Sequence, residues 1–165
     1  YGFSKGFAMT GWRLGYAAAP AAITRAMTVM QSNSTAGVNP FVQRAGIAAL
    51  EGSRDEVERM RLRYKARRDM VLAALRAMPD IGIGDIPATF YAFPDVSALL
   101  GRKAGNHVLD TSEQLCDWLL DEHGVATVPG TAFGAPNSIR LSFAASEADI
   151  EKALARLARA FARLS

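Results

Sequence analysis

The chain of 165 residues has one cysteine, four lysines and no long hydrophobic run. A single cysteine, Cys116, excludes an internal disulfide bond. No apolar stretch reaches the roughly 18 residues that a membrane-spanning helix needs, and no signal-peptide pattern is seen. We therefore expect a cytoplasmic protein that has no membrane partner. The two histidines, His107 and His123, are isolated in sequence and are not expected to serve as metal ligands or bases.

The chain also lacks a large excess of either sign of charge. It has 19 Lys and Arg residues and 16 Asp and Glu residues, for a net charge of +3. Such a weak basic bias does not predict a nucleic-acid partner. The segment 59–68 places several basic residues on one face of a predicted helix, but no aromatic residues alternate with them. We interpret this face as solvated.

The order of the predicted elements favours an α/β fold class. Half of the residues are hydrophobic, so the chain can build a substantial core. Helices are predicted over about 20–31, 39–52, 53–79, 111–124 and 146–164. Strands are predicted over 14–19 (short and buried), 89–93, 125–128 and 138–143. We expect a domain boundary between Gly52 and Ser53.

The stretch from Ser4 to Arg13 carries the strongest chemical signal. Lys5 lies in an uncharged, mostly apolar setting, and Arg13 follows eight residues later. An amine that attacks an aldehyde must be neutral, which a dry pocket and a nearby cation both favour. The planar guanidinium of Arg13 suits a phosphate dianion, and the Ser4 hydroxyl offers a further donor. A Schiff-base lysine beside a phosphate would need residues of these types.

The motif Ser-Lys-x-x-x-Met-x-Gly-x-Arg, which begins at Ser4, resembles the cofactor-lysine motif of class I and II pyridoxal-phosphate aminotransferases. The fuller run SKGFAMTGWRLGY is most similar to the bacterial aspartate aminotransferase group. The similarity covers essentially the whole chain and is to the C-terminal part of a fold-type I enzyme. It implies that 1–52 ends the large cofactor-binding domain and that 53–165 forms the small α/β domain.

A second motif, residues 137–144, resembles the part of the same family that holds a substrate-binding arginine. Arg140 matches the arginine that grips the substrate α-carboxylate there. On a strand, Arg140 should face opposite to Ile139 and Leu141, and a buried arginine on that face would need a carboxylate partner. Two further stretches match: 88–95 resembles a small-domain strand that lines the site, and 31–35 resembles a loop near the dimer interface.

The resemblance implies a cofactor, substrates and a mechanism. Pyridoxal 5'-phosphate would be attached to Lys5, with Arg13 and Ser4 on its phosphate and Arg140 on the substrate carboxylate. Lys5 would move the Cα proton while an amino group passes between an amino acid and a 2-keto acid. The full-length enzyme would be a homodimer.

The family's site also needs an acid at the pyridine nitrogen, a ring stacked on the cofactor and donors to the phenolic oxygen, and these precede the lysine. We therefore expect a fragment of a longer aminotransferase that is inactive alone. Two alternatives stay open. One is a non-catalytic truncated remnant that acts only in association. The other is a pyridoxal-phosphate-dependent lyase or synthase on the same fold.

Overall fold

The computed structural model describes residues 1–165 and divides into two compact units, unit one (Tyr1–Met60) and unit two (Arg61–Ser165). Helix α3 (Asp55–Arg76) contains the limit between them. The domain limit predicted between Gly52 and Ser53 falls just before this helix and stays a prediction. Ser53 Oγ accepts a hydrogen bond from the Asp55 amide at 3.1 Å, where α3 begins.

Unit one consists of an N-terminal loop with the short helix η1 (Thr10–Trp12), followed by α1 (Ala21–Ser34) and α2 (Pro40–Glu51). Both longer helices confirm the predicted helices, but the loop expected over 31–35 is wrong for residues 31–34, because α1 continues to Ser34. Asn39 caps α2, because its side-chain oxygen accepts a hydrogen bond from the Phe41 amide at 3.2 Å. Pro40 occupies the first turn, where its missing N–H is no loss.

The buried strand predicted over 14–19 is wrong. Gly15 forms one isolated antiparallel bridge with Gly2, and every residue from Gly15 to Ala19 is exposed. The apolar run indicated burial, but a strand is stabilised by a partner strand over several residues. Here only the segment at Gly2 lies alongside.

Helix α1 buries none of its 14 residues. Its exposed apolar side chains include Ile23, Val29 and Met30, which are 53%, 61% and 73% exposed. Few residues of unit one are buried, namely Phe3, Met9, Val42 and Gly46. Unit one therefore has little core of its own.

Unit two is built around a three-stranded antiparallel sheet with the strand order β1-β5-β4. The strands are β1 (Tyr91–Ala92), β4 (Val128–Pro129) and β5 (Ile139–Ser142). Tyr91 pairs with Ser142, and Val128 pairs with Arg140. The central strand β5 confirms the strand predicted over 138–143, whereas β1 and β4 are shorter than predicted.

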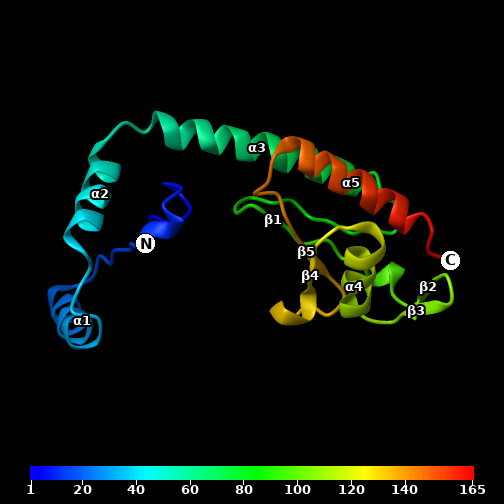
Figure 1. Ribbon diagram of the computed structural model, residues 1–165, viewed down its shortest axis with the longest axis horizontal. Helices are drawn as coiled ribbons and strands as arrows, with labels where there is room; N and C mark the ends of the chain where they lie inside the picture. Colours follow the sequence, from blue (N-terminus) through cyan, green and yellow to red (C-terminus); the bar gives the residue numbers. More distant parts are fainter. The chain divides into compact units, whose positions relative to one another are not determined.

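Three helices share a buried core with this sheet: α3, α4 (Ser112–His123) and α5 (Glu147–Phe161). Within unit two, α5 lies beside the second half of α3 (Figure 1), and Arg67 Nε is 3.8 Å from Glu147 Oε1. The α5 residues Ile150, Leu154 and Leu157 are buried, as the helical stripe predicts. They belong to a core cluster that continues through Leu75, Leu119 and Phe143.

Helix α4 begins and ends as its sequence predicts. The Thr111 hydroxyl accepts from the Gln114 amide while the Gln114 side chain accepts from the Thr111 amide, which completes a capping box. Gly124 ends the helix with φ of 60°, a left-handed conformation that glycine adopts at low cost.

Two features of unit two are absent from the sequence prediction. A hairpin joins β2 (Arg102–Ala104) to β3 (His107–Leu109) through the two-residue loop 105–106. Short 3-10 helices also form, η2 (Ser97–Leu99) after β1 and η3 (Gly130–Phe133) directly after β4.

Candidate functional site

The loop that carries the predicted lysine, residues 4–13, is closed at its base. The Phe3 amide donates to the Leu14 carbonyl oxygen at 3.2 Å, and the Tyr16 amide donates to the Tyr1 carbonyl oxygen at 2.8 Å. The rings of Tyr1 and Tyr16 stack with their centres 5.5 Å apart. We call residues 4–13 the lysine loop. These contacts fix the backbone on both sides of the loop, next to Lys5 at one end and Arg13 at the other.

Turns inside the lysine loop bend the chain back on itself. The Ala8 amide donates to the Lys5 carbonyl oxygen at 3.2 Å, and the Trp12 amide donates to the Met9 carbonyl oxygen at 3.2 Å. Ala8 and Arg13 both have positive φ, 53° and 52°. Non-glycine residues rarely adopt this conformation, so it marks a specific loop geometry.

The three predicted cofactor residues lie in this one loop. Lys5 and Arg13 are exposed, and Ser4 is half-buried. One guanidinium nitrogen of Arg13 donates to the Thr10 carbonyl oxygen at 3.1 Å, which orients the side chain. A primary amine, a guanidinium and a hydroxyl are therefore presented by ten consecutive residues.

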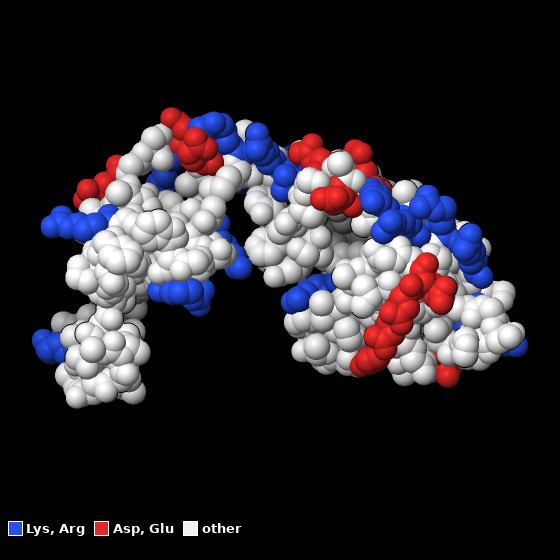
Figure 2. Space-filling model, in the orientation of Figure 1, with Lys and Arg blue, Asp and Glu red and all other residues white.

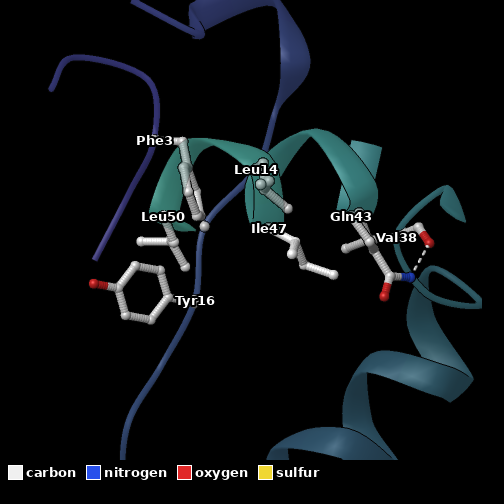
Figure 3. Close-up of a pocket in the computed structure, with 9 residues that line it drawn as sticks. Phe3, Leu14, Tyr16, Val38, Gln43, Ile47 and Leu50 are labelled. Carbon is white, nitrogen blue, oxygen red and sulfur yellow. Dashed lines mark hydrogen bonds between the residues drawn. The ribbon is translucent and has the colours of Figure 1, made fainter. Parts of the chain in front are cut away.

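Helix α2 supports the base of the lysine loop. Phe3 is 3% exposed, and a Cβ atom on Gly46 would lie 2.5 Å from Leu14 Cδ2, so the glycine allows the loop to approach the helix closely. An apolar pocket of about 350 Å³ opens beside this contact (Figure 3). Gln43 closes one side of it by donating to the Val38 carbonyl oxygen at 2.7 Å.

Arg13 also lines a pocket of about 530 Å³ formed with α1. Thr24, Thr28 and Ser32 contribute hydroxyls to it. Each of these hydroxyls donates to a backbone carbonyl oxygen, either within α1 or, for Thr24, of Ala19 just before it. Arg13 is therefore the one charged donor lining this pocket, which Lys5 and Ser4 do not line.

The acidic residues of unit one all follow residue 50, namely Glu51, Asp55, Glu56 and Glu58. The first 50 residues contain no Asp or Glu, and Arg25 is the only charged residue of α1. Figure 2 shows charged residues gathered over α3 and α5, whereas the surface at α1 is mostly uncharged. A carboxylate for a pyridine nitrogen is therefore not supplied by residues 1–50.

Arg140 lies in unit two, at the centre of β5. It is half-buried, while its neighbour Ile139 is fully buried. Its Cζ atom is 4.4 Å from the centre of the Tyr91 ring and 4.4 Å from the centre of the Phe133 ring. No ion pair among residues 1–165 involves Arg140. The partner of its charge within this chain is aromatic rather than acidic.

The structure thus brings Ser4, Lys5 and Arg13 into one loop of unit one and places Arg140 in unit two. Sequence reasoning did not single out Tyr91 and Phe133 as neighbours of Arg140. Tyr91 could have been found from strand pairing, because it lies diagonally across from Arg140 in the register. No local pattern indicates Phe133, which reaches Arg140 from η3.

Two other reactive residue types lie in unit two. Both histidines line one pocket of about 450 Å³ together with Trp118 and Arg163. No group of three or more His, Cys, Asp or Glu among the 165 residues could hold a metal ion.

Burial raises the pKa of the Cys116 thiol, which accepts a hydrogen bond from Thr127 Oγ1 at 3.0 Å. A protonated, buried thiol is a poor nucleophile.

The side chains of the lysine loop fit a phosphorylated aldehyde by their chemistry. Lys5 carries an amine of the type that can react with an aldehyde, and Arg13 and Ser4 carry groups of the type that can donate to a phosphate. The absence of acids from the first 50 residues leaves the ring nitrogen of a pyridine without a partner there. The residue types of the loop therefore fit the aldehyde and the phosphate of pyridoxal phosphate, but they do not include a partner for its ring nitrogen.

Known proteins match this chain along nearly all of its length. The family described as Aminotransferase class I and II matches residues 1–157. An aspartate aminotransferase of Rhizobium meliloti is 39% identical over 99% of the chain and 40% of its own length. A probable aspartate/prephenate aminotransferase of Rhizobium leguminosarum is 37% identical over 96% of the chain and 40% of its own length.

Solved structures match as well. The crystal structure of the Rhizobium meliloti aspartate aminotransferase superposes with a TM-score of 0.95 at 38% identity, covering 99% of this chain and 41% of that one. An aromatic aminotransferase from Pyrococcus horikoshii superposes with a TM-score of 0.85 at 36% identity, covering 96% and 41%.

The fold and these matches define an α/β chain of the fold-type I aminotransferase kind. The chain belongs to the class I and II aminotransferases, and the resemblance to the bacterial aspartate aminotransferase group is confirmed. It spans about 40% of the length of the curated relatives it matches. None of its helices is both long enough and apolar enough to cross a membrane.

Proposed function

We propose that the chain is the C-terminal part of a pyridoxal-phosphate-dependent aminotransferase that transfers an amino group from an aspartate-type amino acid to a 2-keto acid. The observation that supports this proposal is the closed lysine loop, which contains both Lys5 and Arg13 in a chain of this family. The names of the relatives support aspartate as the amino acid.

Lys5 is the proposed catalytic residue. Bound pyridoxal phosphate would supply an aldehyde and an electron-withdrawing ring that stabilises negative charge at the substrate Cα. The Lys5 amine would hold the cofactor in the resting enzyme. During the reaction Lys5 Nζ would take the proton from the substrate Cα and return a proton in the second half of the transfer.

The two arginines are proposed to bind anionic groups at opposite ends of the reactants. Arg13 would hold the cofactor phosphate, assisted by the Ser4 hydroxyl, because a guanidinium pairs with a phosphate through two parallel hydrogen bonds. Arg140 would bind the substrate α-carboxylate in the same two-pronged way. Fixing the carboxylate orients the Cα–H bond for proton removal.

We further propose that the 165-residue chain does not turn over alone and that the working enzyme is a homodimer. The absence of acids from residues 1–50 supports the first statement, since the pyridine nitrogen needs a carboxylate. The exposed apolar side chains of α1 support the second, because such a surface is normally covered by further protein. The proposed domain limits are 1–52 and 53–165.

The same exposed surface favours the second candidate, a non-catalytic chain that acts only in association. Both candidates predict self-association, so size alone does not separate them. They differ in whether Lys5 is required for an activity.

A graft tests the proposed reaction. Residues 1–165 would replace the matching 41% of the Rhizobium meliloti aspartate aminotransferase. We expect the grafted enzyme to transaminate aspartate with 2-oxoglutarate, and Lys5→Ala to reduce the rate by about 10²–10⁴-fold, the usual contribution of a proton-transfer residue. Lys65→Ala is the control, because Lys65 is paired with Asp69 on α3. Equal rates for Lys5→Ala and the unmodified graft would refute the proposal.

A further inference from the structure

Two aromatic rings hold the guanidinium of Arg140. Tyr91 and Phe133 each lie with their ring centres 4.4 Å from its Cζ atom. The two rings form no ring contact with each other, so they approach the guanidinium from different directions. We propose that Tyr91 and Phe133 are positioning residues that orient Arg140 for a planar carboxylate. This inference rests on the carboxylate-binding role proposed above for Arg140, and we call the three residues the aromatic clamp.

Neighbouring strands supply the first half of the clamp. Tyr91 of β1 pairs with Ser142 of β5, so it lies diagonally opposite Arg140, within reach of a long side chain. Tyr91 is itself fixed by Phe90, whose ring centre is 4.5 Å away. The sheet register therefore determines this contact.

The second half of the clamp depends on η3, which carries Phe133. The Gly130 amide donates to the Ser138 carbonyl oxygen at 2.8 Å, which connects the start of η3 to the residue directly before β5. Thr131 donates a hydrogen bond to Glu113 of α4. Phe133 also meets Phe93 edge to face, with ring centres 5.9 Å apart. Three contacts therefore hold the segment that places Phe133 against Arg140.

The contacts leave the in-plane donors of the guanidinium available. Aromatic rings attract a cation through their faces and accept none of its N–H groups in ordinary hydrogen bonds. No ion pair or side-chain hydrogen bond among residues 1–165 uses the guanidinium N–H groups of Arg140. Arg102 of the same unit differs, because Asp80 accepts its guanidinium hydrogen bond at 2.7 Å. Arg140 is thus held in place while its fork of donors is unoccupied.

Holding the side chain in advance lowers the cost of binding. A free arginine loses rotamer entropy when it grips a ligand, and a pre-oriented one loses less. The planar fork matches the two oxygens of a carboxylate and not a single acceptor. The clamp therefore favours carboxylates over carboxamides of the same shape.

Rotation of the guanidinium tests the clamp without any ligand. Nuclear magnetic resonance of the arginine-labelled 165-residue chain would measure rotation about the Nε–Cζ bond of Arg140. We expect Phe133→Leu to make this rotation about 2–5-fold faster, which corresponds to the loss of one exposed cation–π contact. Phe133→Tyr retains a ring and should restore the slow rotation. Phe133 is 48% exposed, so its replacement removes no core residue. Equal rotation rates in all three proteins would overturn the inference.

A titration with succinate separates the clamp from the proposed function. Binding would be followed by isothermal titration calorimetry, with Arg140→Leu as the reference. We expect Phe133→Leu to bind succinate about 2–5-fold more weakly than the unmodified chain and Phe133→Tyr to bind it equally. Binding that needs Arg140 but is unchanged in Phe133→Leu overturns the clamp and supports the proposed role of Arg140. Binding that is the same in Arg140→Leu overturns that role, and the rotation rates then decide whether the clamp exists.

Discussion

The Phe3 amide donates a hydrogen bond to the Leu14 carbonyl oxygen at 3.2 Å, and this bond closes the loop that holds Lys5 and Arg13. The two residues are eight positions apart, yet the closure makes them part of one structural element. Phe3 itself is 3% exposed and contacts the rings of Phe7 and Tyr16. Its side chain is therefore the main apolar anchor of the loop base.

Removing that anchor should open the loop. Phe3→Ala deletes a buried ring, a change that costs about 3–5 kcal/mol in a packed site. We expect hydrogen exchange of the Tyr16 amide, which donates across the loop base, to become at least about tenfold faster. Phe41→Ala removes an equal ring that is 65% exposed and serves as the control. Unchanged exchange in Phe3→Ala would mean that Phe3 does not hold the base.

Helices α1 and α5 should differ widely in stability despite similar lengths. Helix α1 has 14 residues and buries none, whereas α5 has 15 residues and buries five. Isolated helices shorter than about 12–15 residues are marginal in water. We expect α1 amides of the 165-residue chain to exchange within about tenfold of unfolded rates and α5 amides to be protected almost to the global limit. Strong protection of α1 at low protein concentration would show that this helix is stable without a covering partner, contrary to our expectation.

Gly130 should tolerate no side chain. A Cβ atom there would lie 2.1 Å from the Ala135 carbonyl oxygen and 2.4 Å from the Ser138 carbonyl oxygen, both backbone atoms. We expect Gly130→Ala to lower the free energy of unfolding by more than about 2 kcal/mol, as overpacking against rigid atoms does. Gly84→Ala meets nothing within 4 Å and should change stability by less than about 1 kcal/mol. Urea unfolding of both variants gives the comparison.

Acid should weaken the contact between α4 and η3. The hydroxyl of Thr131 donates to Glu113 and lowers the pKa of that carboxyl. A lowered pKa in the folded state contributes stability that is complete above the ordinary glutamate value of about 4.3 and is lost as pH falls through the folded value. Glu113→Gln should therefore flatten the pH dependence of unfolding free energy below about pH 4.3. Parallel curves for the two proteins below that pH would exclude this contact as a source of stability.

Local signals in the sequence predicted much of this structure, and tertiary contacts account for what it did not predict. The cap at Thr111 and the α5 stripe from Ile150 to Phe161 depend on neighbouring residues, so the sequence predicts them well. The strand expected over 14–19 failed because its apolar run lacks a partner strand. The hairpin at 105–106 was missed although a Gly-Asn pair is typical of two-residue loops.

The candidate site likewise has a part that the sequence predicts and a part that depends on tertiary contacts. Lys5 and Arg13 were predicted from a contiguous motif, and the structure shows one closed loop around them. The rings beside Arg140 come from positions 91 and 133, far from it in sequence. Only the sheet register and the path of η3 bring them to 4.4 Å, so no pattern along the chain could indicate both.

Chemical trapping tests the central claim most directly. The grafted enzyme would be incubated with pyridoxal phosphate, reduced with sodium borohydride and digested, and its labelled peptides would be identified by mass spectrometry. We predict one dominant label, on the peptide that contains Lys5, and loss of that label in Lys5→Ala. A dominant label on Lys65, Lys103, Lys152 or a lysine outside the graft would contradict the account.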